Sequence, residues 1–288
     1  MKKKIENKKN NLPVENNGIR ISKFIADCGV CSRRKAKEFI CQQRVKVNNE
    51  VVTDLSRKIY LNDIVTLDDV VLKKEDKTVI ALNKPVGVIC SVYDKFGRKT
   101  VIDLLKNYKN IRLYPVGRLD YNSRGLVILT NDGFLAYKIT HPKFGIPKVY
   151  DVIINKKISK QDYNKLINGI KIEGKELYPL KVEIISSDKE FLKDVKRIGF
   201  IESNLKRENK IFLNFSKIRI KIAEGRKRII RKVFKALGYK VVDLRRIQIG
   251  EFNLDNYPNE LKEGHYKVLD REEIEKLLEK KIPLNKPK

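Results

Sequence analysis

The sequence is poor in metal ligands and has no long apolar run. Its 288 residues include only four cysteines and two histidines. Cys28 and Cys31 have metal-ligand spacing, but zinc needs a fuller ligand set, and there is no second CxxC or HxxxH pair. We therefore expect free, reduced thiols and no metal. No apolar run reaches the roughly 18 residues of a transmembrane helix, so we expect no membrane partner.

Glycine-rich phosphate-binding patterns are also absent. Neither GxGxxG nor GxxxxGK[ST] occurs, which argues against a nucleotide cofactor or ATP, and we expect no cofactor at all. Residues 1–18 lack the apolar centre of a secretory signal, and we interpret them as a disordered basic tail. These observations favour a cytoplasmic location.

Positive charge, by contrast, is abundant. The chain has 64 Lys and Arg against 36 Asp and Glu, a formal net charge of +28. Such a surplus repels itself in the folded state and typically serves a polyanionic partner, with nucleic acid the first candidate and a membrane surface the second. A solvated surface alone explains a modest surplus, but not the clustering of cations in residues 19–47 and 205–246. Two basic blocks suggest two contact surfaces on one long ligand.

Residues 19–72 predict a compact unit of two short helices followed by strands. Ser22 and Ser32 are expected to cap the helices, and Gly29 separates them. The segment VKVNNEVV alternates around Asn48-Asn49, which predicts a hairpin. The polar residues 73–76 read as a linker.

This unit resembles the S4 RNA-binding domain. The resemblance is carried by IRISKFIADCGVCSRRKAKEFICQQRVKVNNEVV, residues 19–52. Gln43-Arg44 and Asn49 stand where that family has glycines. The resemblance implies that basic side chains position the domain on the phosphates of structured RNA without reading its sequence. The residues expected to do so are Arg20, Lys23, Arg33, Arg34, Lys35 and Lys37.

Residues 77–285 alternate strands and helices without a strict rhythm. TVIALNKP and GLVILT read as buried strands bounded by turns. Hairpins mixed with helices favour an α+β fold on a mixed, mostly antiparallel sheet over a doubly wound parallel sheet. The polar stretch 186–211 reads as an elaborated loop.

One carboxylate, Asp120, precedes a buried strand and lies between Gly117 and Gly125, which suggest tight backbone on both sides. The neighbouring Arg118 should lower the pKa of Asp120 and keep it ionised. An ionised carboxylate in a largely apolar cleft can act as a nucleophile or base. Alternatively, Arg118 and Asp120 form a structural ion pair at a strand end. The residues alone leave both interpretations open.

The segment GRLDYNSRGLVILTNDG, residues 117–133, closely resembles the signature of the pseudouridine synthases that modify ribosomal RNA. Three further segments match that family in order: ALNKPVGVICS (81–91), HPKFGIPKVYDV (141–152) and EGRKRIIRKVFKALGYKVVDLRRIQIG (224–250). The similarity spans essentially the whole chain. It implies an S4-like domain over 19–72 and a catalytic domain with a central cleft over 77–285.

The resemblance also implies roles for individual residues. Asp120 would be the catalytic carboxylate that acts on the target uridine. Tyr150 would stack on the base and assist proton removal, and Arg231 would pair with Asp120 and keep it anionic. Arg118 and Lys84 would contact the substrate, Lys84 as part of the cleft wall. The alternatives are a plain strand aromatic for Tyr150 and a solvated helix charge for Arg231.

One departure from the family pattern concerns the segment after residue 224. Ile229 replaces the family's Gln or Glu, which removes a polar contact and leaves the role of Arg228 open.

The function implied is isomerisation of a uridine to pseudouridine in ribosomal RNA, with base flipping and no cofactor. The 23S RNA is the preferred substrate and the 16S RNA the alternative. A second hypothesis is a ribosome-assembly factor with a vestigial cleft. A methyltransferase would need a glycine-rich cofactor loop, which is absent. The expected partners are ribosomal RNA or assembling ribosomal particles, bound by a monomer.

Overall fold

The structure is a computed structural model that describes residues 18–186 and 215–280. The expected basic tail, apart from Gly18, and nearly all of the polar stretch 186–211 lie outside the described residues. The chain forms two compact units, residues 1–76 and 77–288, and the polar residues 73–76 end the first unit. No helix in the described ranges is long and apolar enough to cross a membrane.

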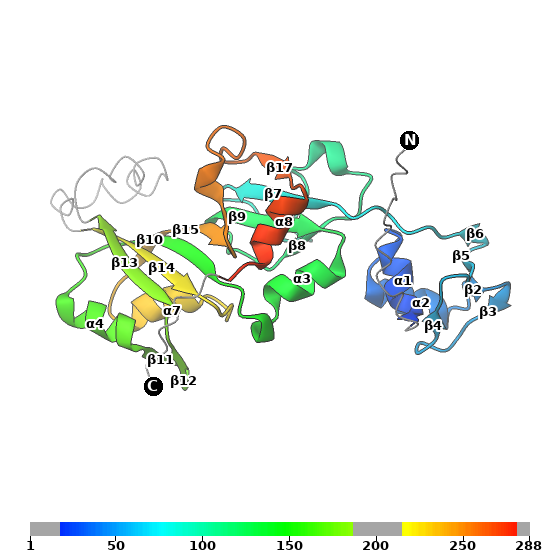
Figure 1. Cartoon of the computed structure of the whole chain (residues 1–288), viewed down its shortest axis with the longest axis horizontal. Helices are drawn as coiled ribbons and strands as arrows, with labels where there is room; N and C mark the ends of the chain where they lie inside the picture. Colours follow the sequence, from blue (N-terminus) through cyan, green and yellow to red (C-terminus); the bar gives the residue numbers. More distant parts are fainter. Residues whose placement is uncertain (1–17, 187–214, 281–288) are drawn as a thin grey trace, which may run out of the picture. The chain divides into compact units, whose positions relative to one another are not determined.

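The N-terminal unit combines two short helices with two small antiparallel sheets (Figure 1). The helices are α1 (Ile21–Asp27) and α2 (Arg33–Cys41), which pack against each other through fully buried Ile25 and Ile40. One sheet pairs β1 with β4, and the other has the order β3-β2-β5-β6. The strands are β1 (Ile19–Arg20), β2 (Val45–Val47), β3 (Glu50–Val51), β4 (Lys58–Ile59), β5 (Val65–Leu67) and β6 (Val70–Val71).

Local signals in this unit are mostly confirmed. Ser32 caps α2, because its Oγ accepts a hydrogen bond of 3.1 Å from the Lys35 backbone N–H. Asn48 and Asn49 have φ values of 52° and 69°, as the tight hairpin between β2 and β3 requires. The prediction for Ser22 is wrong: α1 starts directly after β1, and Ser22 is buried inside its first turn.

The second unit is built on a nine-stranded mixed sheet with the order β13-β14-β10-β15-β9-β7-β17, in which β8 also pairs with β9 and β16 with β15. The ladder between β9 and β15 is parallel, and the other ladders described for this sheet are antiparallel. The predicted mixed, mostly antiparallel sheet is therefore confirmed. The strands are β7 (Val79–Lys84), β8 (Tyr114–Val116), β9 (Arg124–Thr130), β10 (Lys148–Ile154), β13 (Lys181–Ser186), β14 (Ser216–Ile222), β15 (Val241–Ile249), β16 (Phe252–Asn253) and β17 (Tyr266–Val268).

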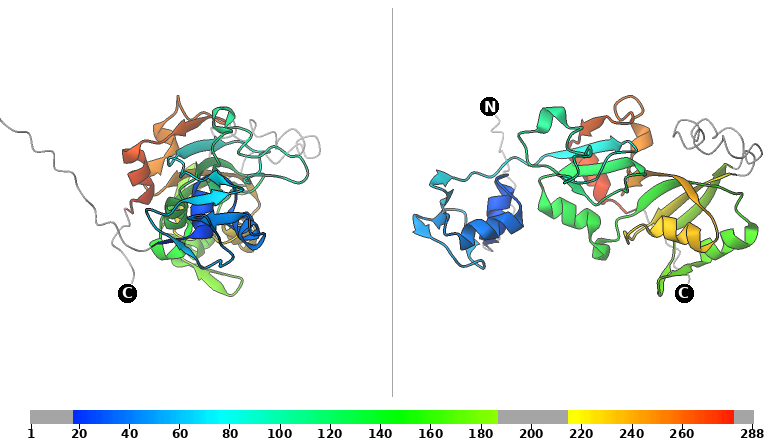
Figure 2. Two further views of the ribbon diagram at one scale, coloured as in Figure 1. Left: turned by 90° about the vertical axis from the view of Figure 1, so that its right-hand side faces the viewer. Right: turned by 180° about the vertical axis from the view of Figure 1, so that it is seen from behind.

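Helices cover both faces of this sheet. α3 (Gly133–Thr140) and α8 (Arg271–Leu278) contribute to one hydrophobic core, and α4 (Lys160–Asn168) and α7 (Ile229–Ala236) contribute to the other. Figures 1 and 2 show α3 and α8 near β8 and β9, with α4 and α7 beside β13 and β14. β7 is apolar throughout most of its length because its alternate residues enter the two cores.

A hairpin and short 3-10 helices add to the described part of this unit. The hairpin turns at Gly174, with the strands β11 (Ile170–Ile172) and β12 (Lys175–Leu177). Short 3-10 helices follow other turns: η1 (Lys106–Tyr108), η2 (Pro142–Phe144) and η4 (Leu254–Asn256).

The parallel ladder between β9 and β15 is short. It pairs Arg124 with Arg245 and Gly125 with Arg246. Gly125 has φ +103°, and a Cβ there would lie 2.2 Å from the backbone oxygen of Arg246. Only glycine therefore lets the two backbones approach so closely. The loop that carries Asp120 enters β9 at this ladder.

Candidate active site

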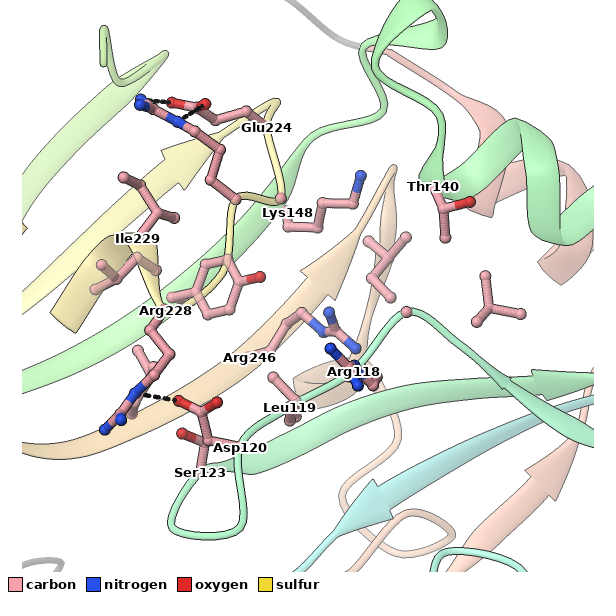
Figure 3. A pocket seen from close by; sticks show the side chains of 18 of the residues that line it. Arg118, Leu119, Asp120, Ser123, Thr140, Lys148, Glu224, Arg228, Ile229 and Arg246 are labelled. Atoms are coloured by element: carbon pink, nitrogen blue, oxygen red, sulfur yellow. Dashed lines mark hydrogen bonds and ion pairs between the residues drawn. The ribbon is translucent and has the colours of Figure 1, made fainter. Parts of the chain in front are cut away.

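A pocket lies where β9 and β15 meet. Its walls come from five stretches of the chain: the loop before β9, the end of α3, β10, the segment that leads into α7, and β15 (Figure 3). Its polar and aromatic lining residues are Arg118, Asp120, Ser123, Thr140, Lys148, Tyr150, Glu224, Arg226, Arg228 and Arg246.

Asp120 forms ion pairs with two arginines from the α7 region. Its Oδ2 lies 3.5 Å from Nε of Arg231 and 3.5 Å from Nε of Arg228. The Arg231 side chain is 17% exposed and that of Arg228 57%, so Arg231 is the buried partner. The expected pairing of Arg231 with Asp120 is thus present. No ion pair among the described residues joins Arg118 to Asp120, although both line the pocket.

Arg231 also fastens the loop that carries Asp120. Its Nη2 donates to the Asn122 carbonyl at 3.0 Å and to the Ser123 hydroxyl at 3.1 Å, and its Nη1 donates to the Val241 carbonyl at 3.2 Å. Burial lowers the pKa of the guanidinium, and the nearby carboxylate of Asp120 opposes that shift. Arg231 is therefore a fixed bridge between α7, the loop and the start of β15, rather than a solvated helix charge.

Lys84 lies beneath the same loop and is fully buried. Its Nζ donates to the carbonyls of Pro85 at 2.8 Å and Ser123 at 2.7 Å. Burial lowers its pKa to about 8. The sequence placed Lys84 on the cleft wall as a substrate contact, but this ammonium group does not line the pocket. It anchors the loop, because it joins the end of β7 to the Ser123 carbonyl of that loop.

β10 contributes Lys148 and Tyr150, which line the pocket together because alternate residues of a strand share a face. Tyr150 is 9% exposed. Lys148 Nζ donates to the carbonyls of Ile139 at 2.9 Å and Ile146 at 2.7 Å. Burial, and secondarily Arg246, lowers the pKa of Lys148 to about 8. The pocket therefore contains both a buried aromatic ring and a half-buried cation.

The replacement of the family's Gln or Glu by Ile229 left the role of Arg228 open, and the segment before α7 shows where Arg228 lies. Arg228 is the N-cap residue of α7 and has φ +55°, an uncommon left-handed conformation for a residue with a side chain. From this position it pairs with Asp120 despite the neighbouring apolar residue. Ile229 itself is 5% exposed and is part of a hydrophobic core, where it forms an apolar section of the pocket wall.

Arg246 is a pocket residue that sequence reasoning counted only as part of a basic block. It is 4% exposed, and its Nε donates to the Leu126 carbonyl at 2.7 Å. One sequence signal for this role exists. Alternate residues of a strand share a face, so Arg246 lies on the same face of β15 as Leu244, which also lines the pocket.

The basic side chains predicted to bind RNA lie at the surface of the N-terminal unit. Lys23 is half-buried and pairs with Asp27 at 2.8 Å, and Lys35 pairs with Glu38 at 2.7 Å. On α2, Ala36 is fully buried, so the cations occupy the solvent side of an amphipathic helix. The exposed members of the predicted set are Arg20, Arg33, Arg34, Lys35 and Lys37.

Among the described residues, no group of three or more His, Cys, Asp or Glu side chains is arranged to hold a metal ion. None of the four cysteines forms a disulfide within the described residues, and burial raises the pKa of Cys28 to about 11. A thiol with so high a pKa is a packing residue rather than a nucleophile.

Comparisons with known proteins agree with this geometry. Residues 78–236 match the RNA pseudouridylate synthase family, and residues 19–65 match the S4 domain. A ribosomal large subunit pseudouridine synthase B of Bacillus subtilis is 38% identical over 82% of this chain and 87% of its own length. An uncharacterized RNA pseudouridine synthase of Aquifex aeolicus is 36% identical over 90% of this chain and 93% of its own.

A crystal structure of a pseudouridylate synthase superposes with a TM-score of 0.59 at 31% identity, covering 90% of this chain and 99% of the other. The predicted fold class, an S4 domain followed by an α+β synthase domain, is confirmed. The chain belongs to the RNA pseudouridylate synthase family and carries an S4 domain at its N-terminal end.

Proposed function

We propose that this protein converts a uridine of 23S ribosomal RNA to pseudouridine, with Asp120 as the catalytic carboxylate. The observation that carries the proposal is the position of Asp120, which faces a pocket lined by Tyr150 while Arg231 holds it from the buried side. The name of the Bacillus subtilis relative supports the large ribosomal subunit as the source of the substrate. The same reaction on 16S RNA is the alternative.

The reaction balances without a redox partner. The bond between C1′ of ribose and N1 of uracil breaks, the base rotates, and a new bond forms between C1′ and C5. The proton on C5 is lost and N1 becomes protonated, so no electrons are gained or lost overall. Asp120 would act either by bonding to the sugar or by removing a sugar proton, and both routes need an anionic carboxylate. Two arginines form ion pairs with this carboxylate.

Tyr150 would stack on the flipped uracil and receive or relay the C5 proton. Its ring is packed and 9% exposed, so the base would meet a surface that needs no rearrangement. Flipping a base out of its stack costs a few kcal/mol. Contacts between cations and the surrounding phosphates would offset that cost.

The RNA around the target would contact a second hollow, which Asp120 also lines. A loop with two exposed aromatic residues, Tyr93 and Phe96, lies there. The guanidinium of Arg98 lies 5.0 Å from the Phe96 ring. Aromatic rings beside cations are typical of surfaces that bind single-stranded RNA. The proposed partner is ribosomal RNA or an assembling ribosomal particle in the cytoplasm, bound by a monomer.

The test is a pseudouridine map of ribosomal RNA from cells that carry either the wild-type protein or Asp120→Asn, which keeps the size of the side chain and removes its charge. We expect one 23S uridine to lose its modification. Asp255→Asn is the matched control, because Asp255 is a half-exposed carboxylate paired with Arg245 at 2.8 Å and does not line this pocket.

The map also separates the alternatives. If a position in 16S RNA loses its pseudouridine instead, the substrate is the RNA of the small subunit. An unchanged map, with Asp120→Asn still bound to ribosomal particles, would favour an assembly factor with a vestigial cleft.

A further inference from the structure

The pocket carries a surplus of cations that its own acids do not neutralise. Five of its lining residues are Lys or Arg, and two are acidic. Asp120 pairs with Arg228 and Arg231. Glu224 pairs with Arg226, with Nε to Oε2 at 2.5 Å and Nη2 to Oε1 at 2.9 Å. Both carboxylates of the pocket therefore already have guanidinium partners.

Three cations of the pocket are left without a carboxylate of the pocket as partner: Arg118, Lys148 and Arg246. None of them takes part in an ion pair within residues 18–186 and 215–280. In Figure 3, the guanidinium groups of Arg118 and Arg246 lie close together, with Lys148 on the neighbouring strand. Like charges gathered in one pocket repel one another, and Arg246 indeed helps to lower the pKa of Lys148. Such an arrangement is stable when an anion completes it.

Arg246 gives the clearest indication that the pocket binds an anion. The residue is 4% exposed, and its Nε is satisfied by the Leu126 carbonyl. Its Nη2 has no hydrogen-bond acceptor in the part of the chain that the structure describes. A buried donor on a charged group without an acceptor is costly, so Arg246 Nη2 needs an acceptor from outside the described residues, such as a water or a ligand. Because Arg246 lines the pocket, an occupant of the pocket can supply that acceptor.

We propose that Arg246, assisted by Lys148 and Arg118, binds a backbone phosphate directly adjoining the uridine that enters the pocket. This rests on the proposed function. The phosphate is the anionic group of RNA, and a planar guanidinium binds it with two parallel hydrogen bonds. The same pocket contains Asp120 and Tyr150, so the phosphate belongs to the flipped nucleotide or to its direct link to a neighbour. Arg246 thereby fixes the ribose relative to Asp120.

The experiment uses the full-length protein and a hairpin RNA centred on the uridine that the modification map identifies. One RNA has a neutral methylphosphonate on the 5′ side of that uridine and another has it on the 3′ side. The ribose before the altered link is 2′-O-methylated in both the altered and the reference RNA, for chemical stability. Dissociation constants are measured for the wild type, Arg246→Gln and Arg246→Lys.

For the wild type, we expect one of the two replacements to weaken binding about ten- to a hundredfold, the range of a charged hydrogen bond. Arg246→Gln should bind the reference RNA more weakly by a similar factor and be insensitive to that replacement. Arg246→Lys keeps a positive charge and should remain sensitive. Arg245→Gln is the control, since Arg245 lies on the same strand, pairs with Asp255 and does not line this pocket.

Full sensitivity of a folded Arg246→Gln would overturn the proposal, as would a wild type that tolerates both replacements. If Arg246→Gln does not fold, Arg246→Lys decides: weaker binding of the reference RNA or a smaller sensitivity than that of the wild type supports the contact, and wild-type values of both count against it. The proposed function fails separately, when the wild type forms no pseudouridine in the same hairpin without any chemical modification.

Discussion

At the scale of single residues, two arginines contact the same oxygen of Asp120 from different environments. Arg231 is buried and also holds Asn122 and Ser123, whereas Arg228 is more than half exposed. We expect Arg231→Met to lower the single-turnover rate about 10²- to 10³-fold, as loss of a preorganised donor does. Arg228→Met should cost about fivefold or less, because an exposed ion pair is worth about 0.2–1 kcal/mol. Equal losses in both variants, each with a wild-type melting temperature, would contradict this ranking.

Lys84 predicts a pH dependence of stability. Its pKa is about 8 in the folded protein, against an ordinary value of 10.5. Below pH 8 both states carry the proton, and the buried charge destabilises the fold. Between about pH 8 and 10.5 the unfolded chain holds the proton and the folded chain does not, so the free energy of unfolding rises with pH.

Lys84→Met is the comparison that isolates this effect. The free energy of unfolding of the wild type should increase relative to Lys84→Met by about 3 kcal/mol over that pH range. Urea titrations of both proteins at a series of pH values measure it. A difference that does not change with pH would show that Lys84 keeps its charge in the fold.

Where the sequence signal was local, it pointed to a residue that lines the pocket, Asp120. The segment 117–133 was sufficient to select Asp120, because its glycines, its arginine and the following apolar strand are contiguous. The position of Lys84 was not predictable in the same way. Whether that ammonium group faces a cleft or is covered depends on the loop at Ser123, which lies 39 residues away in the chain.

At the scale of elements, the site depends on the short parallel ladder between β9 and β15. Gly125→Ala would place a methyl group 2.2 Å from the Arg246 carbonyl oxygen, so the ladder has to open. We expect a loss of at least about 3 kcal/mol of stability. Gly174→Ala is the matched control: Gly174 has φ +77° but nothing within 4 Å of the added Cβ, and the expected cost is about 1 kcal/mol. Urea unfolding of both variants gives the comparison, and equal losses would contradict it.

Most elements followed from local patterns, and the exceptions have a common cause. The helix at 160–168 has a local capping signal in Ser159, whose Oγ accepts a hydrogen bond from the Asp162 N–H at 3.0 Å. The prediction that Ser22 caps the first helix was wrong because β1 continues directly into α1, and β1 forms only by pairing with β4. Arg246 escaped notice because its environment depends on pairing with Gly125. Neither pairing can be read from one segment alone.

At the scale of the whole molecule, a net charge of +28 predicts steeply salt-dependent RNA binding. Arg33 and Arg34 are exposed cations of α2. Changing both to Gln should reduce the slope of log affinity against log salt by about 1.5 to 2, at roughly 0.9 per phosphate contact. The control changes Arg271 and Lys276 of α8 to Gln; both pair with glutamates of their own helix, at 3.1 and 2.9 Å. Equal slope changes in the two double variants would show a diffuse effect of charge rather than a contact by α2.

The ladder between β9 and β15 also sets an order of events during synthesis of the chain. Residues 1–76 form a unit of their own, whereas the pocket needs Arg246 to pair with Gly125, more than a hundred residues earlier. Domains generally fold as units, with the N-terminal one first as the chain is made. The S4 domain can therefore be complete while much of the synthase domain is still being translated. A nascent chain gains its RNA-binding surface well before it gains a site able to modify what it holds.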